Sequence, residues 1–184
     1  MSDDRELKIV FTGPTGAGKT TAIRAISDSP PVSTEVLNTD QTGAPKATTT
    51  VALDFGQLLL EGGTAVSLYG TPGQERFSFM WEILCRGAIG VILLIDGSTA
   101  TALRDLQSFA ATFCRINSNP PLVIGVGRID DCLLDEYAKM LAATGIVAPI
   151  FGVDVRERRD VLLLIETLLC VVEAQSVEHP HAIH

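Results

Sequence analysis

Eight consecutive residues, 13–20, constrain this chain most strongly, because they read GPTGAGKT and satisfy the pattern G-x-x-x-x-G-K-[ST]. A β-favouring run at residues 7–12 precedes them, and helix formers follow at residues 21–27 until Pro30 and Pro31. A glycine-rich turn between a strand and a helix directs backbone N–H groups at phosphate oxygens, and the helix N-terminus adds its positive dipole. The motif therefore predicts a P-loop that holds the phosphates of a nucleotide.

Two side chains of this turn have specific expected roles. Lys19 is expected to reach the β- and γ-phosphates, and the Thr20 hydroxyl to coordinate Mg²⁺. The other positions expected to contact the nucleotide are Gly13, Thr15, Gly16, Ala17, Gly18 and Thr21. The motif alone leaves open which base is bound and for what purpose, so both depend on the rest of the chain.

Apolar runs alternate with helical patterns after the P-loop. Strands are expected at residues 48–60, 65–69, 88–96, 121–126 and 147–153, and helices at residues 79–86, 100–116, 131–143 and 158–174. This order predicts an α/β, three-layer P-loop NTPase fold, with helices on both faces of a mostly parallel six-stranded sheet that includes one antiparallel hairpin strand. Residues 28–47 are expected to form a loop, residues 1–174 one domain, and residues 175–184 a flexible polar tail.

Composition narrows the partners and the compartment. The formal net charge of −8 argues against nucleic acid or an anionic membrane as the main partner. No apolar run approaches the roughly 18 residues of a membrane span, and the N-terminus lacks a signal-peptide pattern. The cysteines show no CxxC spacing, which favours free thiols; they are Cys85, Cys114, Cys132 and Cys170. We therefore expect a cytoplasmic protein with no direct membrane anchor and no nucleic-acid partner.

Residues 48–56, TTTVALDFG, resemble the first switch region of Ras-family GTPases, most closely the Rab form T-x-x-x-D-F. The match selects Thr50, which by this resemblance would bind Mg²⁺ through its hydroxyl and the γ-phosphate through its N–H. Thr49 is a rival for this role, and adjacent threonines are also simply good strand formers.

Residues 68–77, LYGTPGQERF, resemble the second switch motif D-T-A-G-Q-E of the same family. By this resemblance the Gly73 N–H would contact the γ-phosphate, and Gln74 would position the attacking water. Gly70 stands where the motif has an aspartate associated with Mg²⁺. The departure predicts either weaker Mg²⁺ binding or transfer of that role to another residue or to water.

The G-T-P-G form of the motif is similar to a bacterial branch of Ras-like proteins, the gliding-motility-type small GTPases, often grouped with the signal recognition particle receptor β-subunit. The resemblance covers about residues 7–173. It implies a Roadblock-type protein partner, in some cases a GTPase activator, which would bind the switch regions around Thr50 and residues 73–81.

The base-specificity motif N-K-x-D aligns with residues 127–130, GRID. By this resemblance Asp130 would accept hydrogen bonds from guanine N1 and N2, and Arg128 would lie over the base as the lysine does. Gly127 lacks the asparagine amide that usually ties this loop to the P-loop, and Asp131 could replace Asp130 through a one-residue shift. Asp154 and Val155 occupy the last motif, where backbone N–H groups read guanine O6.

The resemblance implies a GTP/GDP-dependent molecular switch that binds GTP with Mg²⁺ and hydrolyses it slowly, with Gln74 and Lys19 as catalytic residues. A nucleotide-bound scaffold that no longer cycles is an alternative, motivated by Gly70 and Gly127. A P-loop kinase or ATPase is another, in which Asp96 would hold Mg²⁺.

An apolar cluster follows the second switch motif, and it has two interpretations. It is either a nucleotide-gated partner surface or ordinary packing against a neighbouring helix. Its members are Phe77, Phe79, Met80 and Trp81.

Overall fold

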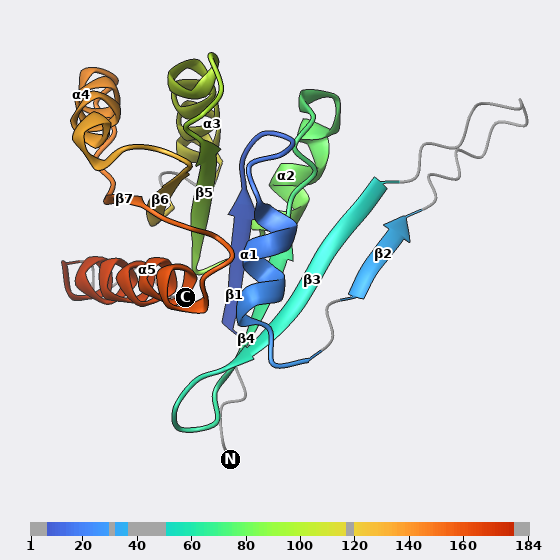
Figure 1. The fold of residues 1–184 in the computed structure, drawn as a ribbon. Coiled ribbons are helices and arrows are strands. Elements are labelled where there is room, and N and C mark those ends of the chain that lie inside the picture. The colour runs from blue at the N-terminus through green and yellow to red at the C-terminus, as the bar shows by residue number, and fades with distance from the viewer. Residues whose placement is uncertain (1–6, 30–31, 37–50, 117–119, 179–184) are drawn as a thin grey trace, which may run out of the picture.

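The computed structural model describes residues 7–29, 32–36, 51–116 and 120–178, and its centre is one seven-stranded sheet (Figure 1). The strands lie in the order β2-β3-β4-β1-β5-β6-β7, and β3 is antiparallel to both of its neighbours while the remaining pairs are parallel. The strands are β1 (Leu7–Thr12), β2 (Val32–Val36), β3 (Val51–Leu59), β4 (Ala65–Gly70), β5 (Gly90–Asp96), β6 (Leu122–Gly127) and β7 (Ile150–Gly152). The α-helices are α1 (Lys19–Ile26), α2 (Ser78–Cys85), α3 (Ala102–Arg115), α4 (Leu134–Ala143) and α5 (Arg158–Glu178), with short 3₁₀ turns at Glu75–Phe77 and Asp131–Leu133.

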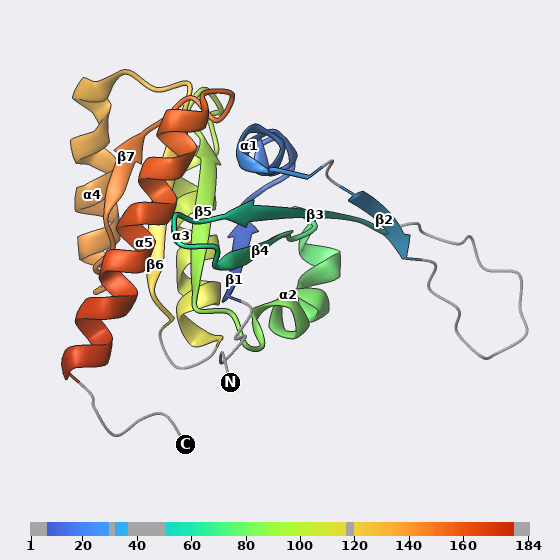
Figure 2. The ribbon, with the colours of Figure 1, turned by 90° about the horizontal axis from the view of Figure 1, so that it is seen from below.

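Helices cover both faces of the sheet, and strand side chains alternate between the two cores. From β1, Ile9 and Phe11 pack with α1 and α5, whereas Val10 packs with α2, α3 and α4. The central strand β5 divides in the same way, with Ile92 on the first face and Leu93 on the second. Figure 2 shows α1 and α2 on opposite sides of β1, β3 and β4. A strand buried on both faces explains why β5 reads as an unbroken apolar run.

The α/β three-layer fold expected from the sequence is confirmed, with one addition at the edge of the sheet. β2 lies in the segment expected to be a loop and pairs antiparallel with β3, so the sheet has seven strands rather than six. β7 is only three residues long, and α5 continues to Glu178, four residues past the expected domain boundary. Among the described residues no helix is long and apolar enough to cross a membrane.

The apolar cluster after the second switch motif divides between core and surface. Trp81 is 3% exposed, and its ring lies 5.1 Å from Phe109 and 5.3 Å from Phe113 of α3, centroid to centroid. Phe79 is 53% exposed on the outer side of α2. Packing against the neighbouring helix therefore accounts for Trp81, while Phe79 remains available at the surface.

Trp81→Ala should lower the free energy of unfolding by about 3–5 kcal/mol, because it removes a large buried ring from the aromatic stack with α3. Phe79→Ala is the matched control and should change it by less than about 0.5 kcal/mol. Urea unfolding followed by circular dichroism measures both, since Trp81 is the one tryptophan of the chain. Equal losses in the two variants would contradict the division between core and surface.

Candidate functional site

The P-loop leaves the carboxyl end of β1, the strand that lies between β4 and β5 at the centre of the sheet. Gly13 has a φ of +134°, and a Cβ at this position would lie 2.0 Å from the Leu94 carbonyl oxygen. Gly18, at the N-terminus of α1, has a φ of +94°, and a Cβ there would meet Val155 at 2.7 Å. Only glycine combines these left-handed conformations with such close approach. The turn therefore packs directly against β5 and the loop before α5.

Lys19 curls back over this turn. Its Nζ donates hydrogen bonds to the carbonyl oxygens of Gly13, at 2.7 Å, and Pro14, at 2.8 Å, and the residue is buried. Burial lowers the pKa of Lys19 to about 8, although the nearby Asp54 carboxylate partly opposes that change. The ammonium is thus held inside the P-loop curl in an environment that favours an added negative charge.

A carboxylate lies against the Thr20 hydroxyl. Thr20 Oγ1 donates a hydrogen bond to Asp54 Oδ2 at 2.5 Å. Asp54 on β3 pairs with Gly70 on β4, and a Cβ at Gly70 would lie 3.0 Å from the Asp54 Cβ. A side chain at position 70 would therefore compete with Asp54 for the space beside Thr20.

Asp54 is a site residue that the sequence interpretation missed. It was matched only as part of the T-x-x-x-D-F pattern, without a role of its own. The clue was Gly70, because a carboxylate absent from one strand of a hairpin can be supplied by the directly opposite residue of the other strand.

The turn after β4 lies on the P-loop. A Cβ at Gly73 would be 2.4 Å from the Thr15 backbone nitrogen, so these two backbones are in direct contact. The turn is held from behind, where the Trp81 indole N–H donates to the Pro72 carbonyl at 2.9 Å. Gln74 is exposed just beyond it. The structure thus brings Gly73 against the P-loop backbone at Thr15.

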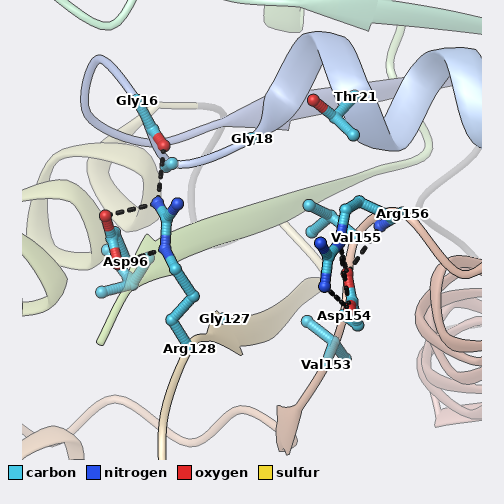
Figure 3. Close-up of a pocket in the computed structure, with 12 residues that line it drawn as sticks. Gly16, Gly18, Thr21, Asp96, Gly127, Arg128, Val153, Asp154, Val155 and Arg156 are labelled. Atoms are coloured by element: carbon cyan, nitrogen blue, oxygen red, sulfur yellow. Dashed lines mark hydrogen bonds and ion pairs between the residues drawn. The ribbon is translucent and has the colours of Figure 1, made fainter. Parts of the chain in front are cut away.

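A pocket of about 400 Å³ adjoins the P-loop and lies in the size range of small-ligand sites (Figure 3). It is enclosed by the P-loop with the start of α1, the ends of β5 and β6, and the loop between β7 and α5. Its lining residues are Gly16, Ala17, Gly18, Thr21, Ile95, Asp96, Gly127, Arg128, Val153, Asp154, Val155 and Arg156. Arg128 and Asp96 lie on one side of it and Asp154 and Arg156 on the other.

Ion pairs order both sides of the pocket. Arg128 binds Asp96 through two nitrogens, and Arg156 binds Asp154 in the same two-pronged manner. The Arg156 side chain and backbone N–H hold the pKa of Asp154 down to about 2. Partial burial alone would raise the pKa of Asp96, but bonds from Arg128 and Ser98 keep it below its usual value.

The backbone N–H of Val155 is a donor of the pocket that lacks an acceptor among the described residues. Asp154 N–H donates to Asp160, and Arg156 N–H donates to Asp154. Within the described part of the chain, no acceptor lies on the N–H of Val155, between them. Val155 therefore presents a hydrogen-bond donor to whatever occupies the pocket.

The expected base-reading residues fall in different places. Arg128, Asp154 and Val155 line the pocket, whereas Asp130 is exposed and is not among the lining residues. Thr50 lies outside the described residues, as does its rival Thr49. Arg156 and Asp96 line the pocket although the sequence interpretation gave neither a base-side role.

Comparison with known proteins gives a family and several relatives. The model of a family described as "conserved hypothetical ATP binding protein" matches residues 31–148, more than half of the chain. The matched segment begins after the P-loop, so it includes β3 to β6 and the loop that carries Arg128.

The relatives include two Ras-related proteins and an intraflagellar transport protein. Rab-18-B of Danio rerio is 30% identical over 138 residues, covering 71% of this chain and 61% of the relative. Rab-12 of Mus musculus is 27% identical over 136 residues, covering 72% and 51%. Intraflagellar transport protein 22 of Chlamydomonas reinhardtii is 25% identical over 112 residues, covering 61% and 55%. The chain therefore spans between about half and three fifths of the length of these relatives, and its similarity to them supports a Ras-like protein.

Nucleotide affinity should fall as pH rises through about 8, by up to about tenfold for each pH unit. The reason is that Lys19 attracts phosphates in its protonated form and not in its neutral form. Bound phosphates stabilise the ammonium and raise the pKa of Lys19, so nucleotide binding takes up protons above pH 8. Below pH 8 the contribution of Lys19 to nucleotide affinity is fully present. Calorimetric titration at pH 7.5–9.5, in two buffers of different ionisation enthalpy, measures the uptake.

Lys19→Arg provides the control, because guanidinium keeps its charge throughout this range. Its affinity, weaker or not, should be independent of pH there. If the affinity of Lys19→Arg changed with pH, or that of the natural protein did not, Lys19 would not be the group that makes nucleotide binding depend on pH.

Proposed function

The chain belongs to the family of conserved hypothetical ATP-binding proteins, and from that premise we propose that it is a small Ras-like GTPase, switching between GTP- and GDP-bound forms with Mg²⁺. The observation that carries the proposal is the pocket beside the P-loop. Four segments far apart in sequence line it together: residues 16–21, 95–96, 127–128 and 153–156. A phosphate turn continuous with a pocket large enough to hold a nucleobase suits a nucleotide bound with its phosphates over α1.

Guanine is the base that the pocket favours. Guanine O6 is a hydrogen-bond acceptor, whereas the corresponding N6 group of adenine is a donor. The free Val155 N–H matches the former. The similarity to Rab-18-B and Rab-12 supports the same choice, although the family description names ATP. In this proposal Asp130 would accept hydrogen bonds from guanine N1 and N2.

Thr20 and Asp54 suit a Mg²⁺ ion. Mg²⁺ prefers oxygen ligands and is usually held by one or two protein groups together with phosphates and water. The Thr20 hydroxyl would bind the ion, and Asp54 would accept hydrogen bonds from its waters, taking the role that Gly70 lacks. Thr50 would add a second hydroxyl. The bound ion would neutralise charge on the β- and γ-phosphates.

The switch would operate through the turn at Gly73. Because this turn rests on Thr15, a γ-phosphate held by the P-loop would lie within reach of the Gly73 N–H. Gln74, which follows directly, would orient the attacking water, and Lys19 would stabilise negative charge on the phosphates. We expect slow hydrolysis in the absence of an activating partner.

The partner would bind the switch regions around Thr50 and residues 73–81. Phe79 and Ile83, both more than half exposed on α2, supply apolar surface there. A Roadblock-type protein fits the resemblance to the gliding-motility group, which rests on the G-T-P-G form of the motif. In this proposal the protein acts in the cytoplasm.

A nucleotide-bound scaffold that does not cycle is the second candidate. Two residues suggested it, Gly70 and Gly127. In this proposal Asp54 would take the role of the carboxylate that Gly70 lacks, so the remaining support is Gly127 and the exposed position of Asp130. These features bear on how the base is held rather than on hydrolysis, so the cycling switch is favoured.

Nucleotide-free protein titrated with fluorescent GDP, GTP and ATP should bind both guanine nucleotides at least about tenfold more tightly than ATP, with Mg²⁺ strengthening the binding. Phosphate release from GTP should then continue through several turnovers. Preference for ATP would replace the guanine proposal, and tight binding without turnover would favour the scaffold.

Asp54→Asn should weaken Mg²⁺ binding to the nucleotide complex by about tenfold or more, while nucleotide binding measured in EDTA changes little. Titrating Mg²⁺ against the dissociation rate of fluorescent GDP measures this. Asp28→Asn is a matched control, because Asp28 follows α1 at the end opposite the P-loop and its carboxylate accepts from the Leu59 N–H of β3. An equal effect in both variants would show that Asp54 acts only on stability.

A further inference from the structure

The loop after β6 is joined to the P-loop by one side chain. Arg128 Nη2 donates to the Gly16 carbonyl at 3.2 Å, and the same guanidinium binds Asp96 through Nε, at 2.9 Å from Oδ1, and through Nη2. Figure 3 shows the guanidinium between the Asp96 carboxylate and Gly16, at one side of the pocket. We call these three groups, Asp96, Arg128 and the Gly16 carbonyl, the brace.

The Asp96 carboxylate accepts four hydrogen bonds in this arrangement. Besides its two bonds from Arg128, its Oδ1 accepts from both the backbone N–H and the hydroxyl of Ser98. Its side chain is only 15% exposed, compared with 63% for that of Arg128. A carboxylate engaged in this way anchors a guanidinium, and it is poorly placed to serve as the Mg²⁺ ligand of a kinase or ATPase.

The backbone conformation of Arg128 also indicates that this residue is held in place by its surroundings. Its φ is +53°, and it is the one non-glycine residue with positive φ in the described part of the chain. Side chains other than glycine disfavour this conformation by about 1–2 kcal/mol, so surrounding contacts must maintain it. The loop is also tied to β5 through the backbone, because Gly97 N–H donates to the Gly127 carbonyl at 2.8 Å. The end of β5 is therefore a fixed support for Arg128.

The ion pair alone would contribute little, because the arginine is exposed to water. Its importance is geometric, since a two-pronged bond to Asp96 fixes the plane of the guanidinium and leaves Nη2 directed at the P-loop. Losing Asp96 would free the arginine to leave Gly16, which would remove this side-chain link between the loop after β6 and the P-loop.

We propose that Asp96 is a positioning residue that holds Arg128 against the P-loop and thereby slows release of the bound nucleotide. The inference rests on the proposed function for the identity of the ligand, whereas the brace itself consists of the chain's own groups alone. It assigns Asp96 a role in nucleotide retention that requires no contact with the nucleotide.

The test compares Asp96→Asn, Arg128→Gly and the double variant in the full chain, with fluorescent GDP and Mg²⁺. Glycine suits the left-handed φ, so Arg128→Gly removes the side chain without straining the loop. Each single variant should release GDP about tenfold faster, and the double variant no faster than Arg128→Gly, because the two residues act as one unit.

Arg158→Ala is the matched control. Arg158 likewise bridges a carboxylate, Asp28 at 3.1 Å, and a backbone carbonyl, Ile26 at 2.9 Å, but at the far end of α1. It should release GDP within about twofold of the natural rate. Comparable acceleration in this control would overturn the proposal, since loss of any surface ion pair would then suffice.

Hydrogen exchange of the nucleotide-free protein supplies the readout that does not depend on the ligand. Both Asp96→Asn and Arg128→Gly should speed exchange in residues 13–18 and 127–130, and Arg158→Ala should not. Unchanged exchange, or additive effects on GDP release in the double variant, would overturn the proposal. If the natural protein holds no guanine nucleotide, the proposed function fails, and exchange still decides whether the brace exists.

Discussion

The position of β1 at the centre of the sheet is the constraint on which the site depends. Because β1 lies between β4 and β5, its carboxyl end opens at the point where the sheet's connections diverge. The P-loop that follows must pass over β5, and Gly13 meets the Leu94 carbonyl so closely that no side chain would fit. Parallel strands then bring the ends of β5, β6 and β7 to the same edge. The pocket follows from this strand order.

The strand order and register also bear on Gly70 and Gly127, the two positions where the sequence departs from the Ras-family motifs. The β3–β4 register places the Asp54 carboxylate beside the Thr20 hydroxyl, directly across the hairpin from Gly70. In the loop after β6, Arg128 follows Gly127 and contacts both Asp96 and the P-loop.

The turn at Gly73 connects this site with the rest of the molecule. Its backbone touches the P-loop, and its neighbour Pro72 accepts a hydrogen bond from Trp81, which is stacked on α3. Pro72 and Trp81 therefore join this turn to the aromatic packing between α2 and α3. Exposed Phe79 and Ile83 lie on the same helix as Trp81.

The sequence by itself determined the P-loop, the alternation of strands and helices, and the residues of the buried strands, because these depend on local spacing and on periodicity along the chain. It could not determine that β2 pairs with β3, or that Asp54 meets Thr20 and Asp96 meets Arg128. Those contacts join residues 32 and 34 positions apart, and they exist only once the sheet has fixed strand order and register. Polar groups that read a ligand are placed by such long-range geometry, and for this reason only the tertiary structure decided which carboxylates belong to the site.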